Sequence, residues 1–134
     1  MIRMNVRVAR WLAGALLAAT GPTFAQHYVI TNVATTLSSA EVREAFLGEK
    51  QFAGGTKLVP VDSLTGQEEF LAKFLAMDRT KYAAVWTKKA FREGLVQPPQ
   101  KSGDNEVLEF VRRTPGAVGY VGTAPSGVNV VQKY

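Results

Sequence analysis

Residues 37–48 read Leu37-Ser38-Ser39-Ala40-Glu41-Val42-Arg43-Glu44-Ala45-Phe46-Leu47-Gly48, and they carry the clearest local signal in the chain. Ser38 is suited to cap a helix, and Glu41 three residues later completes a capping box. Leu37 before the cap and Val42 inside the helix form the matching hydrophobic staple. The final glycine is suited to end the helix. The stretch therefore predicts a short helix that packs on a core through one apolar face.

Working outward from this helix, four apolar stretches predict strands, at residues 28–30, 58–61, 117–121 and 128–131. Pro60 cannot donate to a sheet ladder, so its strand is expected at an edge of the sheet. Helical spacing of apolar residues predicts further helices around 70–75, between Asp78 and Gly94, and over 104–113. Strands that alternate with helices predict an α/β fold, with a mixed sheet of about four strands flanked by helices.

The helix expected after Asp78 has a wide apolar stripe, which is typical of a helix that faces a core. Its members are Tyr82, Ala83, Trp86, Ala90 and Phe91. Residues 97–103, rich in Pro, Gln and Gly, are expected to form a loop without regular structure.

The N-terminus has the pattern of a cleavable signal peptide. Arg3, Arg7 and Arg10 precede an apolar run over 11–19, and residues 23–25 offer small residues at the two positions that a signal peptidase reads. The run is about half of the ~20 residues that a membrane span needs. We therefore expect residues 1–25 to be removed, leaving a single periplasmic domain, residues 26–134, that does not insert into a membrane.

Charge and composition exclude several classes of protein. Three of the 16 basic residues fall in the leader and all 11 acidic residues fall after it, so the net charge of residues 26–134 is +2. The pairs Lys88-Lys89 and Arg112-Arg113 are interpreted as solvated helix faces, and no basic stripe indicates nucleic-acid binding. The absence of cysteine excludes a disulfide framework, thiolate chemistry and a lipid-anchored form.

Candidate catalytic residues are few. His27 is the one histidine and lies two residues after the expected cleavage point, where a chain tends to fray. No nucleophile–base pair, metal-ligand spacing or dinucleotide fingerprint is present. We therefore expect no enzyme, no cofactor and no metal. An enzyme would become the better interpretation if His27 met a carboxylate in a closed pocket.

The segment Asp62-Ser63-Leu64-Thr65-Gly66 lies between a predicted strand end and a predicted helix start. The first turn of a helix has unpaired N–H groups and a partial positive charge, which suit an oxyanion. Ser63 and Thr65 would add hydroxyl donors, and Gly66 would let a ligand approach the backbone. The alternative is that Ser63 or Thr65 only caps the helix, with Thr65 and Glu68 as a second capping box.

Three stretches in this order resemble the substrate-binding proteins of phosphate-type ABC transporters, especially their short stand-alone relatives. They are residues 37–48, the strand Val59-Pro60-Val61-Asp62, and Arg113-Thr114-Pro115-Gly116-Ala117-Val118-Gly119-Tyr120-Val121. The first resembles the family's short helix ending in Phe-Leu-Gly, and the last its Pro-Gly-Ala-Ile-Gly-Tyr signature. The resemblance covers nearly all of residues 28–131 and implies one lobe of a type II periplasmic-binding-protein-like fold.

The resemblance also implies a ligand-binding role for Ser63 and Thr65, with Asp62 and Gly66 beside them, toward an inorganic oxyanion such as phosphate. Two departures are visible. Pro60 and Val61 stand where phosphate binders have an arginine, and Leu64 interrupts the family's Ser-Gly-Thr order. The leading hypothesis is a weak oxyanion binder. The alternative is a non-enzymatic interaction module that kept the fold, lost the ligand, and binds an envelope protein or a second copy of itself.

Overall fold

The computed structural model describes residues 26–134. The predicted signal peptide, residues 1–25, lies outside the described residues. The elements in chain order are β1 (Tyr28–Thr31), α2 (Ser39–Phe46), β2 (Phe52–Ala53), β3 (Thr56–Lys57), β4 (Val59–Pro60), β5 (Asp62–Ser63), α3 (Gln67–Phe70), a π-helical turn (Leu71–Leu75), α4 (Arg79–Glu93), β6 (Gln100–Lys101), α5 (Asp104–Arg113), β7 (Ala117–Val121) and β8 (Asn129–Lys133). No helix within this span is long and apolar enough to cross a bilayer.

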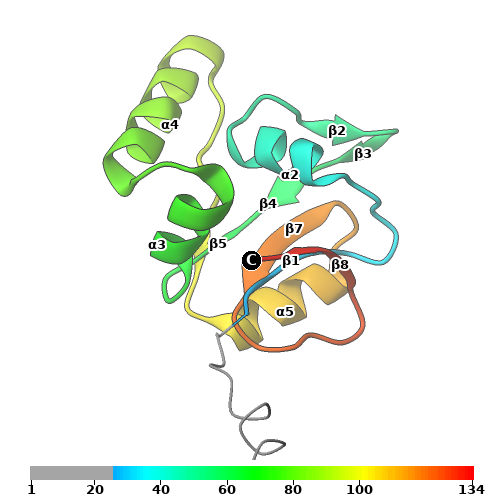
Figure 1. The fold of residues 1–134 in the computed structure, drawn as a ribbon. Coiled ribbons are helices and arrows are strands. Elements are labelled where there is room, and N and C mark those ends of the chain that lie inside the picture. The colour runs from blue at the N-terminus through cyan, green and yellow to red at the C-terminus, as the bar shows by residue number, and fades with distance from the viewer. Residues whose placement is uncertain (1–25) are drawn as a thin grey trace, which may run out of the picture.

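The main sheet has four strands in the order β4-β7-β1-β8 (Figure 1). β1 is antiparallel to both β7 and β8, whereas β4 is parallel to β7. The mixed four-stranded sheet predicted from the sequence is therefore confirmed. β4 lies at an edge, and the N–H groups of Val59 and Val61 on either side of Pro60 point toward β7. The proline nitrogen thus faces the free edge, where a missing donor breaks no ladder bond.

Both faces of the two central strands are buried. Val29 of β1, with Val118 and Tyr120 of β7, belongs to a core cluster that α2, α3 and the π-helical turn cover. The alternate positions, including Ile30, Ala117 and Val121, belong to a second cluster under Val107 and Val111 of α5. Figure 1 shows α2 and α5 on opposite sides of the sheet. Because side chains alternate along a strand, one apolar run serves both cores.

The helix over residues 39–46 forms as its sequence predicts. The Ser38 hydroxyl accepts from the Glu41 N–H, and the Glu41 carboxylate accepts from the Ser38 N–H, which completes the capping box. Leu37 and Val42 are both buried in the first core cluster. Gly48 takes a φ of +74° directly after the helix, as a glycine at a helix end commonly does.

Three local expectations are wrong. Thr65 does not cap the next helix, because α3 begins after Gly66 with no side-chain cap and continues after four residues into the π-helical turn. Residues 97–103 are not all loop, because β6 pairs in parallel with β5. The stripe on α4 is narrower than predicted: Tyr82 and Trp86 are buried, whereas Ala83, Ala90 and Phe91 are exposed.

The two ends of the described chain lie side by side. The N–H of His27 donates to the carbonyl of Tyr134 at 2.8 Å, and the N–H of Tyr134 donates back to His27 at 2.9 Å. Their rings are stacked, with centroids 5.3 Å apart. Residues 26–134 thus contain the complete sheet and both core clusters, which are the features that a span needs to fold alone.

Gly116, before β7, provides a test of this packing. It has a φ of +88°, and an added Cβ would overlap the carbonyl oxygen of Lys57 in β3. Gly116→Ala should lower the free energy of unfolding of residues 26–134 by about 3 kcal/mol, because backbone strain adds to the clash. Urea unfolding followed by Trp86 fluorescence measures the change.

The matched control is Gly55→Ala in the β2–β3 turn, where an added Cβ meets nothing within 4 Å. We expect the control to stay within about 0.5 kcal/mol of the parent. Equal effects of the two substitutions would contradict the predicted close approach of β7 to β3.

Candidate functional site

The candidate site begins where the strand containing β4 and β5 leaves β7. The N–H groups of Val59 and Val61 donate to the backbone carbonyls of Gly116 and Val118. The next N–H on that side, from Ser63, donates instead to the Tyr120 hydroxyl at 2.9 Å. A side-chain oxygen therefore replaces the backbone acceptor, and the chain diverges from the sheet to form the loop Ser63–Gly66.

The other side of the same strand is held by β6 and the residues that flank it. The Asp62 N–H donates to the carbonyl of Pro99, and the Leu64 N–H donates to the carbonyl of Lys101. The start of the loop is thus fixed from both sides, by Tyr120 on one and by β6 on the other. Such a loop is preorganised, because little conformational freedom remains to be lost on binding.

Asp62 lies at the centre of this arrangement, with no exposed surface. One carboxylate oxygen accepts from the Tyr120 hydroxyl and the other from the Tyr82 hydroxyl, both at 2.8 Å. Burial raises the pKa of Asp62, and the hydrogen bonds from the two phenols offset part of that rise. Burial and the neighbouring carboxylate raise the pKa of Tyr82 and Tyr120, so both phenols remain donors at neutral pH.

The four residues predicted for ligand binding fall into two groups. Asp62 and Ser63 are buried, and Asp62 faces the two tyrosines. Thr65 is exposed and Gly66 half-buried. The hydroxyls of Ser63 and Thr65 lie 3.2 Å apart, within hydrogen-bond distance. The structure therefore brings Ser63 and Thr65 together, and it leaves Thr65 and Gly66 as the part of the loop open to solvent.

Backbone donors remain in this open part. Within residues 26–134, the N–H groups of Ser63 and Leu64 are bonded, whereas those of Thr65 and Gly66 have no acceptor among the described residues. An added Cβ on Gly66 would come within 3.4 Å of the Tyr120 ring. The loop at Gly66 therefore lies beside the Tyr120 ring.

Thr65 lines an open pocket of about 440 Å³ whose other walls are the start of α5, the two residues before it, and Thr123, which follows β7 by two residues. The wall contains two carboxylates. Asp104 accepts from the Gly122 N–H at 3.0 Å, and Glu106 accepts from the Ser102 N–H at 2.8 Å. The pocket thus combines hydroxyl and amide donors with two negative charges, and its lining includes no cationic side chain.

His27 does meet a carboxylate, but not in a closed pocket. Its Nε2 lies 2.7 Å from the Glu69 carboxylate, and the side chain of Glu69 is 48% exposed. Lys73 shares the same carboxylate at 3.4 Å. The contact lies at the surface of the molecule, because the Glu69 side chain is half exposed. Among residues 26–134, no three side chains of the His, Cys, Asp or Glu type gather to hold a metal.

Sequence reasoning missed the two tyrosines that position the loop. Tyr82 and Tyr120 lie 20 and 58 residues from Asp62, so no local pattern connects them. A signal was nevertheless present: a tyrosine in an apolar strand or stripe needs a partner for its hydroxyl when it is buried. The carboxylates of Asp104 and Glu106 were missed for the same reason, because only the fold brings α5 to the loop.

Comparison with known proteins identifies the fold. No family model and no curated protein matches the chain. Among solved structures, a protein from Clostridium perfringens assigned to the phosphate ABC transporter substrate-binding proteins, solved with bound phosphate, superposes with a TM-score of 0.51 at 15% identity. An ABC-type phosphate transport receptor from Vibrio cholerae superposes with a TM-score of 0.49 at 14% identity.

Each superposition covers 81% of this chain, but only 45% of the Clostridium protein and 46% of the Vibrio protein. The chain therefore shares the fold of part of the Clostridium protein and spans less than half of its length. At 15% identity the likeness establishes the mixed α/β fold.

Asp62→Asn tests the buried network through pH. Because the folded pKa of Asp62 lies above its ordinary value of 3.8, folding binds a proton more tightly and ionised Asp62 destabilises the fold. The free energy of unfolding of the parent, measured relative to Asp62→Asn, should therefore rise as pH falls from neutral toward 3.8. Urea unfolding of both proteins across this range measures the difference. A constant difference, or one that rises with pH, would contradict the raised pKa.

Proposed function

We propose that this protein is an exported, periplasmic relative of transporter substrate-binding proteins that binds an inorganic oxyanion such as phosphate weakly. In this proposal residues 1–25 are the signal peptide, residues 26–134 the mature domain, and the loop Ser63–Gly66 the binding segment. The protein carries no catalytic role. The observation that carries the proposal is the pair of open amides at Thr65 and Gly66, beside the threonine hydroxyl.

The position of this loop supports the proposal. β5 runs parallel to β6, as β4 does to β7, and the loop follows the carboxyl end of β5. Ligands of open α/β sheets bind outside the carboxyl ends of their strands. Backbone amides in a turn and adjacent hydroxyls are the donors that suit an oxyanion. The hydrogen bond from the Ser63 N–H to the Tyr120 hydroxyl fixes the start of the loop, so these donors do not need to reorganise on binding.

The same geometry predicts low affinity. No guanidinium stands at the strand end to form a bidentate, charge-assisted contact. Asp104 and Glu106 repel an anion in the pocket that Thr65 lines. The pocket is also open to solvent on this chain alone, so an anion there keeps much of its hydration. We expect a Kd for phosphate of about 1 mM, equivalent to about −4 kcal/mol.

A second candidate function is a non-enzymatic interaction module in the envelope, with another protein or a second copy as partner. The carboxylates of Asp104 and Glu106 favour it, because they place two negative charges in the pocket that Thr65 lines, where they oppose an anion. In this case the substrate-binding fold serves as a scaffold, and phosphate produces no heat at the loop.

The combined substitution Ser63→Ala and Thr65→Ala tests the site assignment. The Thr65 hydroxyl is open to the anion and the buried Ser63 hydroxyl lies 3.2 Å from it. Their removal should weaken phosphate binding by residues 26–134 at least about 10-fold, since one hydrogen bond to a charged group is worth about 1.5–3 kcal/mol. Calorimetric titration with phosphate and sulfate at low salt measures the loss. Thr87→Ala on α4 removes a hydroxyl remote from the loop and is the matched control. Heat that survives the double substitution unchanged would remove the site.

Asp104→Asn with Glu106→Gln tests the electrostatic limit on affinity. Both replacements keep an oxygen for Gly122 and Ser102 while removing two negative charges. Each charge near the anion opposes binding by about 1 kcal/mol in a water-like medium, so the double variant should bind phosphate about 30-fold more tightly. The same titration measures the gain. Unchanged or weaker binding would show that the anion does not occupy this pocket.

A further inference from the structure

α4 lies at the periphery of the fold and is anchored on one side only (Figure 1). Two aromatic residues form the anchor: Tyr82 donates to Asp62, and the indole N–H of Trp86 donates to the carbonyl of Phe46 at 3.0 Å. These are the buried residues of this 15-residue helix. Most of its surface therefore faces outward.

The net positive charge of residues 26–134 is concentrated on α4. The helix contains five basic residues and one acidic residue, which are Arg79, Lys81, Lys88, Lys89, Arg92 and Glu93. Its net charge is thus +4, whereas the rest of residues 26–134 carries eight basic and ten acidic residues, a net −2. The domain is therefore an electric dipole with α4 as its positive end.

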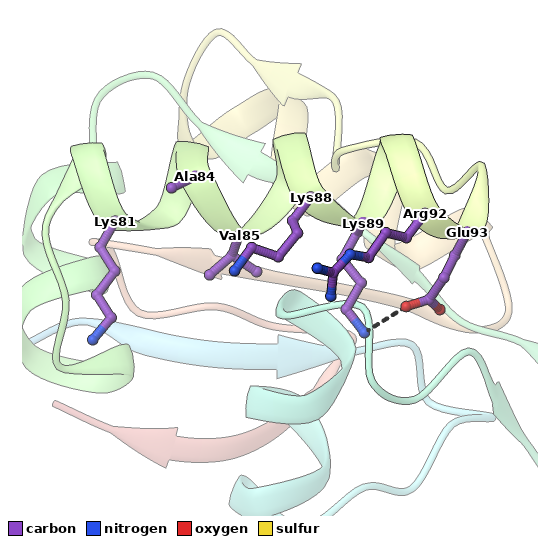
Figure 2. A pocket seen from close by; sticks show the side chains of 7 residues that line it. All are labelled: Lys81, Ala84, Val85, Lys88, Lys89, Arg92 and Glu93. Atoms are coloured by element: carbon purple, nitrogen blue, oxygen red, sulfur yellow. Dashed lines mark ion pairs between the residues drawn. The ribbon is translucent and has the colours of Figure 1, made fainter.

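Three of these cations form a row. Lys81, Lys88 and Arg92 are spaced by seven and four residues, which places them on one side of a helix over about 16 Å. Figure 2 shows them with Val85 and Ala84 along a shallow hollow of about 350 Å³. Lys89 pairs with Glu93 at 3.2 Å, but no described carboxylate lies within 4.0 Å of the three cations in the row. Their charges remain available to an external partner.

An apolar anchor adjoins this row. Phe91 is 90% exposed and lines the neighbouring face of α4 together with Thr80, Ala83 and Thr87. Val96, in the loop after the helix, is 86% exposed. A large aromatic side chain left in water beside a row of cations is typical of a segment that rests on a charged interface.

We propose that α4 docks on the surface of an anionic phospholipid bilayer, with the row Lys81, Lys88 and Arg92 on the headgroups and Phe91 inserted between them. A flat anionic surface can reach all three cations at once. The rest of residues 26–134, with its net charge of −2, is repelled from that surface, so the dipole turns α4 toward it. A second copy docked through the same face would bring two positive rows together, and charge repulsion opposes that arrangement.

Vesicle co-sedimentation of residues 26–134 tests the proposal. Vesicles containing about one-third phosphatidylglycerol should bind the domain, and pure phosphatidylcholine vesicles should not. Raising NaCl to about 0.5 M should release it, because screening shortens the Debye length to a few ångströms. Binding to both kinds of vesicle alike, or to neither, would overturn the proposal.

Variants locate the surface. Lys81→Gln with Lys88→Gln and Arg92→Gln should lower partitioning about 100-fold, as each cation near the membrane contributes about 5-fold. Phe91→Ser should lower it about 10-fold. The matched control replaces three exposed cations elsewhere, Lys57→Gln, Arg113→Gln and Lys133→Gln, and should lower it less than about 5-fold. All substitutions are on exposed side chains, and circular dichroism verifies that each variant is folded.

Two outcomes would redirect the assignment. Equal losses from the α4 triple variant and the control triple variant would show general charge attraction and overturn the docking surface. Displacement by a small excess of soluble polyglutamate over lipid phosphate would indicate an acidic protein as the occupant and overturn the lipid. Phosphate titration of the α4 triple variant keeps the two sites separate, since the loop Ser63–Gly66 should still produce its heat.

Discussion

One buried carboxylate connects the central sheet, the helix α4 and the candidate binding loop of this protein. Asp62 accepts from Tyr120 of the central strand β7 and from Tyr82 of the peripheral helix α4. Tyr120 in turn accepts from the amide of Ser63, where the chain leaves the sheet. Burying a carboxylate away from water costs free energy unless its oxygens are hydrogen-bonded, and two phenol donors offset part of that cost. One residue therefore fixes the positions of the sheet, the helix α4 and the loop relative to one another.

For the proposed ligand binding, residues 62–66 have two different roles. Asp62 and Ser63 are buried and hold the loop, whereas Thr65 and Gly66 face solvent and keep free donors. Shape alone does not determine affinity at such a loop. The electrostatic field near the loop also determines affinity. In the pocket beside Thr65, carboxylates of α5 rather than cations set this field. The fold resembles that of the Clostridium substrate-binding protein, but the negative charge beside the loop limits the proposed binding to weak affinity.

Local sequence chemistry predicted the elements well because their signals lie within a few residues of each other. The capping box of α2 and the edge position of Pro60 are decided by neighbouring backbone groups. The wrong expectations concerned residues whose environment is set across the fold. Phe91 shares the apolar character of Trp86, but within residues 26–134 no segment packs over it, and its side chain is exposed. The role of Asp62 depends on partners 20 and 58 residues away, and no periodicity reveals such partners.

Because His27 and Tyr134 are adjacent, a domain of this kind can be inserted into other proteins. The chain enters the domain at His27 and leaves it at Tyr134, and these two residues are hydrogen-bonded to each other. A module of this shape can be spliced into a host polypeptide, or taken out of one, without stretching either partner. The fold is therefore compatible with the domain being one part of a polypeptide more than twice as long. Joining the two ends by a short tether should also let the backbone be opened elsewhere, with the hairpin at Gly54-Gly55 as a natural place for new termini.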